Sequence, residues 1–358
     1  MDVPRELVRF HRQMLVPAIG VDGQRKLAAA HVAVVGCGAL GCTIADILCR
    51  AGVGRMTIVD RDVVEATNLQ RQTLYTEADA AAGTPKAEAA AARLRAINSR
   101  CRVFAEASDL KAENAESLLG MEADRPAAVL DGTDNFGTRY LLNDVCVQHG
   151  VPLVYGGAVG TGGAQFTVIP GRTPCLRCLF PDPPAPGASP TCDTAGILAS
   201  VSITVAALQA LDAIKLIVAG PEAIPTRLQS LDLWSGREHR LEVGDQRRAD
   251  CTCCGRREFE YLRGNHEGDS RTLCGRGAVQ VMPAEGGVEV DLVRLAERLR
   301  PHGDVVVGES HVRAAIAQNT GGFGSKLDLT VFRDGRAIVG GVTDATLARS
   351  IYARYVGS

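Results

Sequence analysis

The chain has 358 residues, and its 39 Lys and Arg nearly balance its 41 Asp and Glu. Only 4% of the residues are aromatic, so the sequence has neither the basic field nor the stacking rings that a nucleic-acid-binding protein needs. The length predicts one large α/β domain with a smaller appendage. The first thirteen residues are charged and lack the apolar core of a secretory signal, so we expect a cytoplasmic protein.

Strand and helix patterns alternate along the first part of the chain. We expect strands at 31–35, 55–60, 101–107, 127–131 and 151–156, and helices at 42–52, 84–97, 113–120 and 139–149. This alternation predicts an α/β fold with parallel strands and right-handed crossovers, the Rossmann-like doubly wound sheet. Ligands of such a sheet bind beyond the carboxyl ends of its strands.

The pattern changes after residue 156. Further strands at 164–170, 227–235 and 239–243 predict antiparallel continuation of the sheet, and 180–196 is a crossover loop rich in Pro and Gly. The segment from Thr194 to Leu211 has eighteen residues without a charge, near the lower limit for a membrane span. Polar residues interrupt it, so we expect a buried core helix and no membrane contact.

A polar break follows Arg263, and we place a domain boundary there. Residues 1–263 are expected to form the main domain, and residues 264–358 a small C-terminal α/β domain of unknown role. Its pattern predicts a hairpin over 327–341 that turns at Asp334-Gly335, followed by an amphipathic helix over 344–356.

A glycine-rich turn separates the first strand from the first helix of the alternating region. Gly36, Gly38 and Gly41 form the Gly-x-Gly-x-x-Gly pattern that cradles phosphates at a helix N-terminus. Asp60 ends the next strand, about twenty residues further on, where a carboxylate binds ribose hydroxyls. These four residues favour NAD and ATP about equally.

The residues that follow differ from those of a dehydrogenase. Asp62, Asn68 and Arg71 lie within one short stretch, and an NAD site seldom needs a strong cation there. Lys86 falls in the first turn of a predicted helix that Thr84 can cap, where the helix dipole makes a lysine mildly unfavourable. A bound phosphate would stabilise Lys86 there, although a solvated lysine at a helix end explains it equally well.

Two carboxylates follow the fourth predicted strand. Asp131 and Asp134 occur in the sequence DGTDN, at a strand end opposite several basic residues. Hard cations prefer oxygen ligands, so the pair indicates a magnesium-nucleotide site. The alternative is that Thr133 or Asp134 caps the next helix, which would explain one of the two carboxylates but not both.

The twelve cysteines include two spaced pairs and several single residues. Two C-x-x-C pairs can supply four thiolates to a tetrahedral structural zinc ion: Cys175 with Cys178, and Cys251 with Cys254. Cys253 lies inside the second pair and could replace a neighbour as ligand. A redox pair is the alternative, but the thioredoxin-like context is missing. Five single cysteines on apolar segments are expected to be small buried side chains: Cys37, Cys42, Cys49, Cys101 and Cys146.

Taken together, these motifs resemble those of the MoeB/ThiF adenylyltransferases, a family that includes HesA and is related to ubiquitin-activating enzymes. The resemblance runs from about Arg5 to Arg256. In chain order its motifs are RFHRQM, GCGALGC, IVDRDVVEATNLQRQTLY, GTPKAEAA, DGTDNFGTRYLLND, CLRC, TCDTAGIL and CTCCG. It implies an enzyme that uses ATP and Mg²⁺, contains structural Zn²⁺, and adenylates the C-terminal glycine of a ubiquitin-like sulfur-carrier protein ending in Gly-Gly.

The resemblance also implies roles for individual residues. Arg71 and Lys86 would hold the phosphates, Asp60 the ribose and Asp134 the magnesium ion, with Asn68 lining the phosphate site. The glycine turn and Asp62 would complete the nucleotide site.

Three further residues receive roles by the same resemblance. Arg12 would reach into the nucleotide site of a partner subunit, which requires a homodimer with two-fold symmetry. An ordinary surface arginine on the first helix is the alternative, and the sequence does not separate the two. Arg139 would steer the tail of the carrier, and a solvated arginine on a helix surface is the alternative. Cys192, on the crossover loop, would take part in thioester or acyl-disulfide chemistry, and an idle loop cysteine is the equal alternative.

Other functions stay open at this point. The carrier would feed thiamine, molybdopterin, thiolated tRNA or a related thio-metabolite, and the sequence does not choose among them. The same fold could adenylate a peptide or a small carboxylate, or the chain could be a non-catalytic scaffold. A Rossmann oxidoreductase fits least well because no hydride-transfer site is apparent.

Overall fold

A computed structural model gives the structure of the chain. It describes residues 5–183, 192–264, 272–273, 278–281, 289–316, 327–342 and 344–356. Two compact units are present: residues 1–77 with 85–266, and residues 78–84 with 267–358. The second unit therefore includes a short segment that the sequence predicts for the first.

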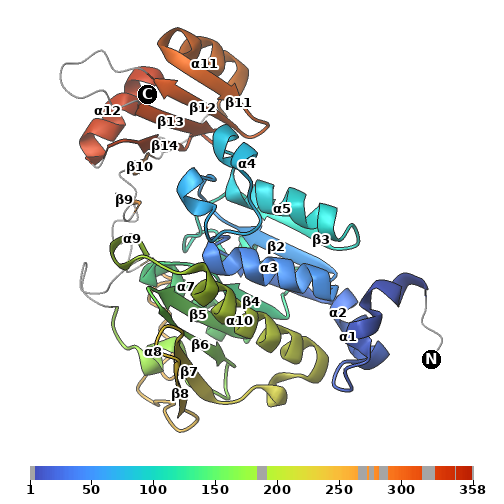
Figure 1. The fold of residues 1–358 in the computed structure, drawn as a ribbon. Coiled ribbons are helices and arrows are strands. Elements are labelled where there is room, and N and C mark those ends of the chain that lie inside the picture. Colours follow the sequence, from blue (N-terminus) through green and yellow to red (C-terminus); the bar gives the residue numbers. More distant parts are fainter. Residues whose placement is uncertain are drawn as a thin grey trace. The chain divides into compact units, whose positions relative to one another are not determined.

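The first unit contains an eight-stranded mixed sheet in the order β3-β2-β1-β4-β5-β6-β7-β8 (Figure 1). The five strands β3, β2, β1, β4 and β5 pair in parallel, and β6, β7 and β8 continue the sheet antiparallel. This architecture confirms the predicted doubly wound sheet with an antiparallel extension. The strands are β1 His31–Val35, β2 Arg55–Val59, β3 Arg102–Glu106, β4 Ala128–Asp131, β5 Leu153–Val159, β6 Gly162–Val168, β7 Arg227–Asp232 and β8 Arg237–Glu242.

Helices cover both faces of this sheet. One face carries α2 (Gly20–Ala29), α3 (Ala39–Ala51), α5 (Lys86–Ile97) and α10 (Ala199–Ala219), which pack against one another (Figure 1). The other face carries α6 (Ala115–Leu118), α7 (Phe136–His149) and α8 (Leu176–Leu179). Short elements complete the unit: η1 Arg5–Phe10, α1 His11–Met14, η2 Ala66–Asn68, α9 Cys192–Ala195 and η3 Pro221–Ala223.

The apolar helix α10 is a core element. By length and composition alone it could cross a membrane, and half of its apolar window is buried inside the protein. It packs against α3, β5 and β6, and its Gln209 donates hydrogen bonds to the carbonyls of Asp131 and Val154 at 2.8 and 3.0 Å. These contacts identify α10 as the predicted core helix. A cytoplasmic location stays a prediction.

The second unit is built on a six-stranded antiparallel sheet in the order β11-β12-β13-β14-β10-β9. The predicted hairpin is confirmed as β13 and β14, which turn at Asp334-Gly335 with φ of +82° at Gly335. Helices α11 and α12 cover one face. The elements are α4 Glu77–Ala82, of which 78–82 belong to this unit, β9 Thr272–Leu273, β10 Ala278–Val281, α11 Leu292–Leu299, η4 Arg300–His302, β11 Gly303–Val307, β12 His311–Ile316, β13 Leu327–Phe332, β14 Ala337–Gly340 and α12 Ala345–Tyr355.

Candidate active site

The glycine turn joins β1 to α3 through very close backbone contacts. Gly36 has φ of +80°, a conformation that favours glycine. A Cβ atom on Gly41 would lie 1.9 Å from the carbonyl oxygen of Gly36, and one on Gly132 would lie 2.2 Å from the same oxygen. The turn therefore touches the residue that follows β4. Glycine at 36, 41 and 132 keeps the two strand ends together.

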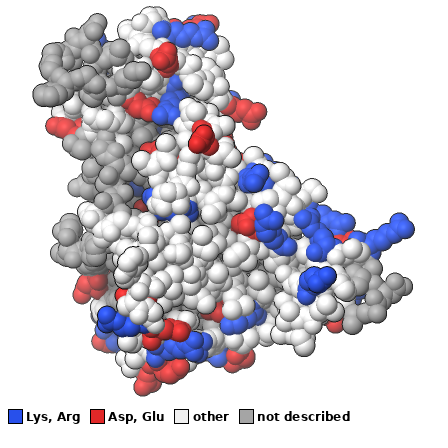
Figure 2. All heavy atoms as spheres, viewed as in Figure 1, with Lys and Arg blue, Asp and Glu red and all other residues white. Residues whose placement is uncertain are grey.

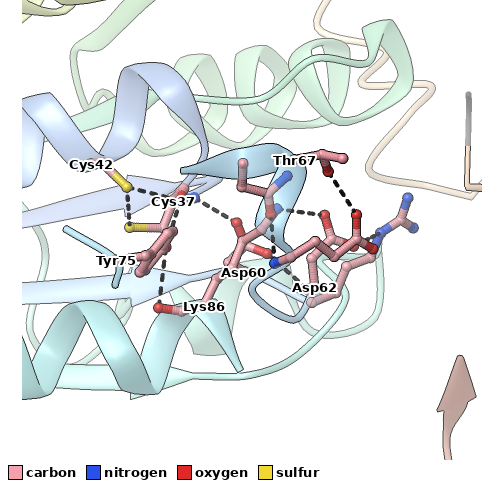
Figure 3. A network of polar contacts seen from close by, with 10 residues as sticks. Cys37, Cys42, Asp60, Asp62, Thr67, Tyr75 and Lys86 are labelled. Carbon is pink, nitrogen blue, oxygen red and sulfur yellow. Dashed lines mark hydrogen bonds and ion pairs between the residues drawn. The ribbon is translucent and has the colours of Figure 1, made fainter. Parts of the chain in front are cut away.

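Asp60 directly follows β2 and fixes the backbone around the turn (Figure 3). Its carboxylate oxygens accept hydrogen bonds from the amides of Cys37 at 2.7 Å and Asp62 at 2.8 Å. Burial raises the pKa of Asp60, and the charge of Lys86 opposes this rise. Asp60 thus connects the glycine turn to the segment that carries Asp62.

Lys86 is the first residue of α5, and its side chain is almost fully enclosed, with 1% of the residue exposed. Its Nζ lies 3.1 Å from Oδ2 of Asp62, and its amide donates to the carbonyl of Asp62 at 2.8 Å (Figure 3). The alternative of a solvated lysine at a helix end is therefore wrong. The helix begins after Pro85, which occupies the N-cap position, one residue later than the sequence predicts.

Tyr75 is a member of this network that sequence reasoning missed. Its buried hydroxyl donates to the carbonyl of Cys37 at 2.6 Å and lies 3.3 Å from the carbonyl of Lys86 (Figure 3). One phenol therefore holds the glycine turn against the start of α5. The sequence carries no signal for this role, because the burial of Tyr75 appears only in the structure.

Asn68 and Arg71 lie on a short turn after β2. The side-chain oxygen of Asn68 accepts from the amide of Glu65 at 3.1 Å as part of a capping box, and Asn68 is buried. Arg71 donates to the carbonyl of Thr67 at 2.9 Å. Both side chains hold the shape of the 65–71 turn, and the guanidinium of Arg71 stays half-exposed.

Asp131 and Asp134, at the end of β4, have different surroundings. Asp131 is fully buried and accepts hydrogen bonds from the amide of Thr133 at 2.9 Å, its hydroxyl at 2.6 Å and Nε of Arg139 at 3.1 Å. Burial raises the pKa of Asp131, and the charge of Arg139 opposes this rise. Asp134 is exposed to solvent. Of the two carboxylates, Asp134 is the one open to an external cation.

The alternative that Thr133 or Asp134 caps the next helix is wrong. Asn135 is the N-cap of α7, and its side chain accepts from the amide of Thr138 at 2.8 Å. Arg139 also donates to the carbonyl of Thr133 at 2.6 Å, and its side chain is only 11% exposed. It therefore supports the loop that presents Asp134, a role that the sequence did not reveal.

Four cysteines from the two C-x-x-C pairs meet at one point. The Sγ atoms of Cys175, Cys178, Cys251 and Cys254 all lie within 4.8 Å of one another. Individual separations are 3.6 Å for Cys175–Cys251, 4.0 Å for Cys175–Cys178 and 3.4 Å for Cys178–Cys254. Tetrahedral thiolates about 2.3 Å from one zinc ion would be roughly 3.8 Å apart, so the cluster fits zinc.

Hydrogen bonds among the four thiols lower the pKa of Cys178 and Cys251 and raise that of Cys175 and Cys254, and Cys253 lies outside the four. A hydrogen bond from Cys175 lowers the pKa of Cys178 to about 6. Cys253 instead accepts a hydrogen bond from the side chain of Asn143 at 3.1 Å, and the oxygen of that side chain accepts from the amide of Leu176 at 2.8 Å. Asn143, on α7, thus bridges the two cysteine-bearing segments. The five single cysteines are buried.

Two candidate residues, Arg12 and Cys192, are not part of the network around Asp60 and Lys86. Arg12 is exposed on α1, and within the described part of the chain its side chain has no hydrogen-bond partner. Cys192 begins α9, whose backbone the structure describes; its side chain lies outside the described residues, as does the crossover-loop segment 184–191. After α9, the carbonyl of Gly196 accepts a hydrogen bond from the amide of Gly160 at 2.8 Å, which attaches this part of the chain to the end of β5.

A family model described as the ThiF family matches residues 10–253. Over 350 residues the chain is 41% identical to the Bacillus subtilis sulfur carrier protein ThiS adenylyltransferase, covering 98% of this chain and 99% of that protein. It is 42% identical over 257 residues to the Thermus thermophilus sulfur carrier protein adenylyltransferase, covering 70% and 91%.

A longer relative and a solved structure extend the comparison. The adenylyltransferase and sulfurtransferase MOCS3 of Sus scrofa is 39% identical over 305 residues, which span 83% of this chain but only 64% of that protein. The crystal structure of Escherichia coli MccB with ATP is similar with a TM-score of 0.55 and 27% identity, covering 66% of this chain and 69% of that one.

Proposed function

Because the chain belongs to the ThiF family, we propose that it is an adenylyltransferase that activates the C-terminal glycine of a ubiquitin-like sulfur-carrier protein with ATP. The observation that carries this proposal is the near full-length similarity to a ThiS adenylyltransferase. Residues 1–263 are proposed to hold this activity. The nucleotide network of Asp60, Asp62 and Lys86 supports it.

The proposed reaction joins two anions. An oxygen of the glycine carboxylate attacks the α-phosphorus of ATP, and the bond to the bridging oxygen breaks so that pyrophosphate leaves with the electron pair. The product is a carrier acyl-adenylate. Fixed positive charge in a site with little water must offset the repulsion between the carboxylate and the phosphates.

Residues of this chain would supply that charge and the orientation of the nucleotide. Lys86 and Arg71 would bind phosphate oxygens, the glycine turn would approach the phosphates with its backbone, and Asp60 would accept from the ribose hydroxyls. Asn68 would line the phosphate site through its nitrogen, since its oxygen is already engaged. Asp62 would keep the Lys86 ammonium in place.

Two metal ions fit the described side chains. Asp134 offers an exposed carboxylate that would hold Mg²⁺, which would neutralise phosphate charge when bound. The four-cysteine cluster would hold Zn²⁺ in a closed structural site with no open position for chemistry. Cys192 would be the thiol that meets an activated carrier, and this role stays a prediction.

We further propose a homodimer in which Arg12 acts in the partner's site. The surface over α3 and α10 is largely free of charged residues (Figure 2), and it exposes Ile203 and Leu211. Leu15, which directly follows α1, is exposed as well. Exposed apolar side chains of this kind are typical of subunit interfaces.

A mixing experiment tests the role of Arg12. Arg12→Ala and Lys86→Met should each be nearly inactive alone. Co-refolded in equal amounts, they should recover about a quarter of the wild-type rate, because half of the dimers are mixed and each mixed dimer has one intact site. The control Arg25→Ala should be active alone. A mixture no more active than its parents would place Arg12 in its own subunit or outside the site.

The proposed reaction is tested by ATP–pyrophosphate exchange with magnesium and a Gly-Gly carrier. We expect exchange only with the intact carrier, and loss of exchange when the last glycine is removed. Asp134→Ala should lower the rate at least about tenfold by weakening the magnesium complex. The matched control Asp22→Ala removes an exposed carboxylate on α2 and should leave the rate unchanged. Exchange with peptides but with no Gly-Gly carrier would favour the peptide alternative instead.

A further inference from the structure

The segment Ala78–Thr84 belongs to the second unit, although the residues on both sides of it belong to the first. It comprises most of α4 and the two residues that follow. The amide of Gly83 donates to the carbonyl of Ala80 at 3.3 Å, and the amide of Thr84 donates to the carbonyl of Asp79 at 3.0 Å. Backbone hydrogen bonds within the segment therefore hold its shape. We call residues 78–84 the α4 excursion.

An arginine of the second unit holds the end of α4. Arg313, on β12, donates from Nη1 to the carbonyl of Ala80 at 2.8 Å and reaches that of Ala81 at 3.4 Å. These carbonyls are near the helix end, where backbone acceptors lack helical partners. Nε of Arg313 also donates to Asp328 on β13 at 2.9 Å, which fixes the guanidinium.

The sheet of the second unit explains why Arg313 faces this segment. Its neighbours Val312 and Ala314 point into the apolar core with α11 and α12. Since side chains alternate along a strand, Arg313 points to the opposite face. Gly83 fits against it with φ of +65°, and a Cβ atom there would lie 2.6 Å from Cδ of Arg313. A glycine is needed at residue 83 for both reasons.

The residues that flank the α4 excursion in sequence belong to the network around Asp62 and Lys86. Tyr75 precedes it, and the Tyr75 hydroxyl lies 3.3 Å from the carbonyl of Lys86, which follows it. Pro85 forms a β-bridge with Val63, and the Lys86 amide bonds the carbonyl of Asp62. Only Pro85 separates the α4 excursion from Lys86, so the backbone that Arg313 holds leads directly into the proposed phosphate-binding residue.

We propose that Arg313 is a positioning residue for the nucleotide site and that the C-terminal unit acts on ATP binding by holding the α4 excursion. This inference rests on the proposed function of Lys86. It assigns the C-terminal unit a role in the reaction. The Arg313–Asp328 pair limits the conformations of residues 80–84 and thereby the placement of Lys86.

The test compares Arg313→Ala with Arg298→Ala in the full chain. Arg298 is a matched control because it donates to the carbonyls of Tyr355 and Val356 in the same unit and makes no described contact with the α4 excursion. We expect Arg313→Ala to raise KM for ATP about fivefold or more, with kcat changed less than about twofold. Asp328→Asn should shift KM in the same direction, and Arg298→Ala should leave it unchanged.

Amide hydrogen exchange gives a readout that is independent of activity. In Arg313→Ala the amides of Gly83 and Thr84 should exchange faster, and the affinity for a non-hydrolysable ATP analogue, measured by calorimetry, should fall as KM rises. Faster exchange with unchanged nucleotide affinity and KM would overturn the proposal. Absence of carrier-dependent activity in the wild type would refute the proposed function, while the calorimetric comparison would still test Arg313.

Discussion

Lys86→Met is expected to lower carrier-dependent ATP–pyrophosphate exchange by about 100-fold to 1,000-fold, the usual cost of removing one fixed group that stabilises developing charge. Lys86 is enclosed by the protein, and its ammonium lies 3.1 Å from the carboxylate of Asp62. In the Lys86→Met variant, water therefore compensates poorly for the missing ammonium charge when the phosphates bind. The rate of exchange at saturating ATP and carrier is the measurement.

The substitution also leaves Asp62 without its cation, which can destabilise the fold by itself. The double variant Lys86→Met/Asp62→Asn removes that unpaired carboxylate and should unfold at a temperature closer to wild type while staying inactive. Lys26→Met is the matched control, since Lys26 is an exposed lysine that donates to the carbonyl of Val218. A well-folded double variant with exchange within about tenfold of wild type would show that Lys86 is not the phosphate ligand.

Loss of the proposed zinc ion from the four-cysteine cluster is expected to be the largest single destabilisation of the first unit. Binding energy at a structural zinc site is folding energy, because the unfolded chain does not hold the site. We expect Cys251→Ser to bind less than one equivalent of zinc and to lower the free energy of unfolding by about 3 kcal/mol or more, or Tm by roughly 10 °C. Metal analysis and calorimetry measure the two effects.

Cys253→Ser is the control for that experiment. Cys253 lies between two members of the cluster in sequence but accepts a hydrogen bond from Asn143 and is not one of the four converging thiols. It should retain one equivalent of zinc and shift Tm by only a few degrees. Equal zinc loss in Cys251→Ser and Cys253→Ser would make Cys253 a ligand, and full zinc content in Cys251→Ser would contradict the metal site.

The sequence was most informative where function depends on local spacing. The glycine turn, Asp60 and the C-x-x-C pairs follow known motif spacings, so the local sequence predicts their positions. The sequence left open whether Lys86 is a phosphate ligand or a solvated lysine, because a position at a helix end does not reveal burial. Lys86 is enclosed by Asp62 and Tyr75, which come from other segments.

The features that the sequence missed depend on distant contacts. The buried Asp131–Arg139 pair looked like a second magnesium ligand and a surface arginine, since neither residue type reveals its partner. Asn143 bridges the two cysteine segments from a helix that is distant from both in sequence. Ala78–Thr84 belongs to the second unit, where it contacts Arg313, more than 200 positions away, and no local pattern encodes such a contact.

The burial of the thiols has a consequence for sulfur and oxidant chemistry. Of the ten cysteines whose side chains the structure describes, nine are buried and Cys254 is half-buried. An acyl-adenylate is an electrophile, and peroxides attack accessible thiolates. A chain that places its thiols in the core or in the four-cysteine cluster withholds them from both reagents. Most of its cysteines are thereby shielded from acylation and from oxidation to sulfenic acid while reactive sulfur passes through the pathway.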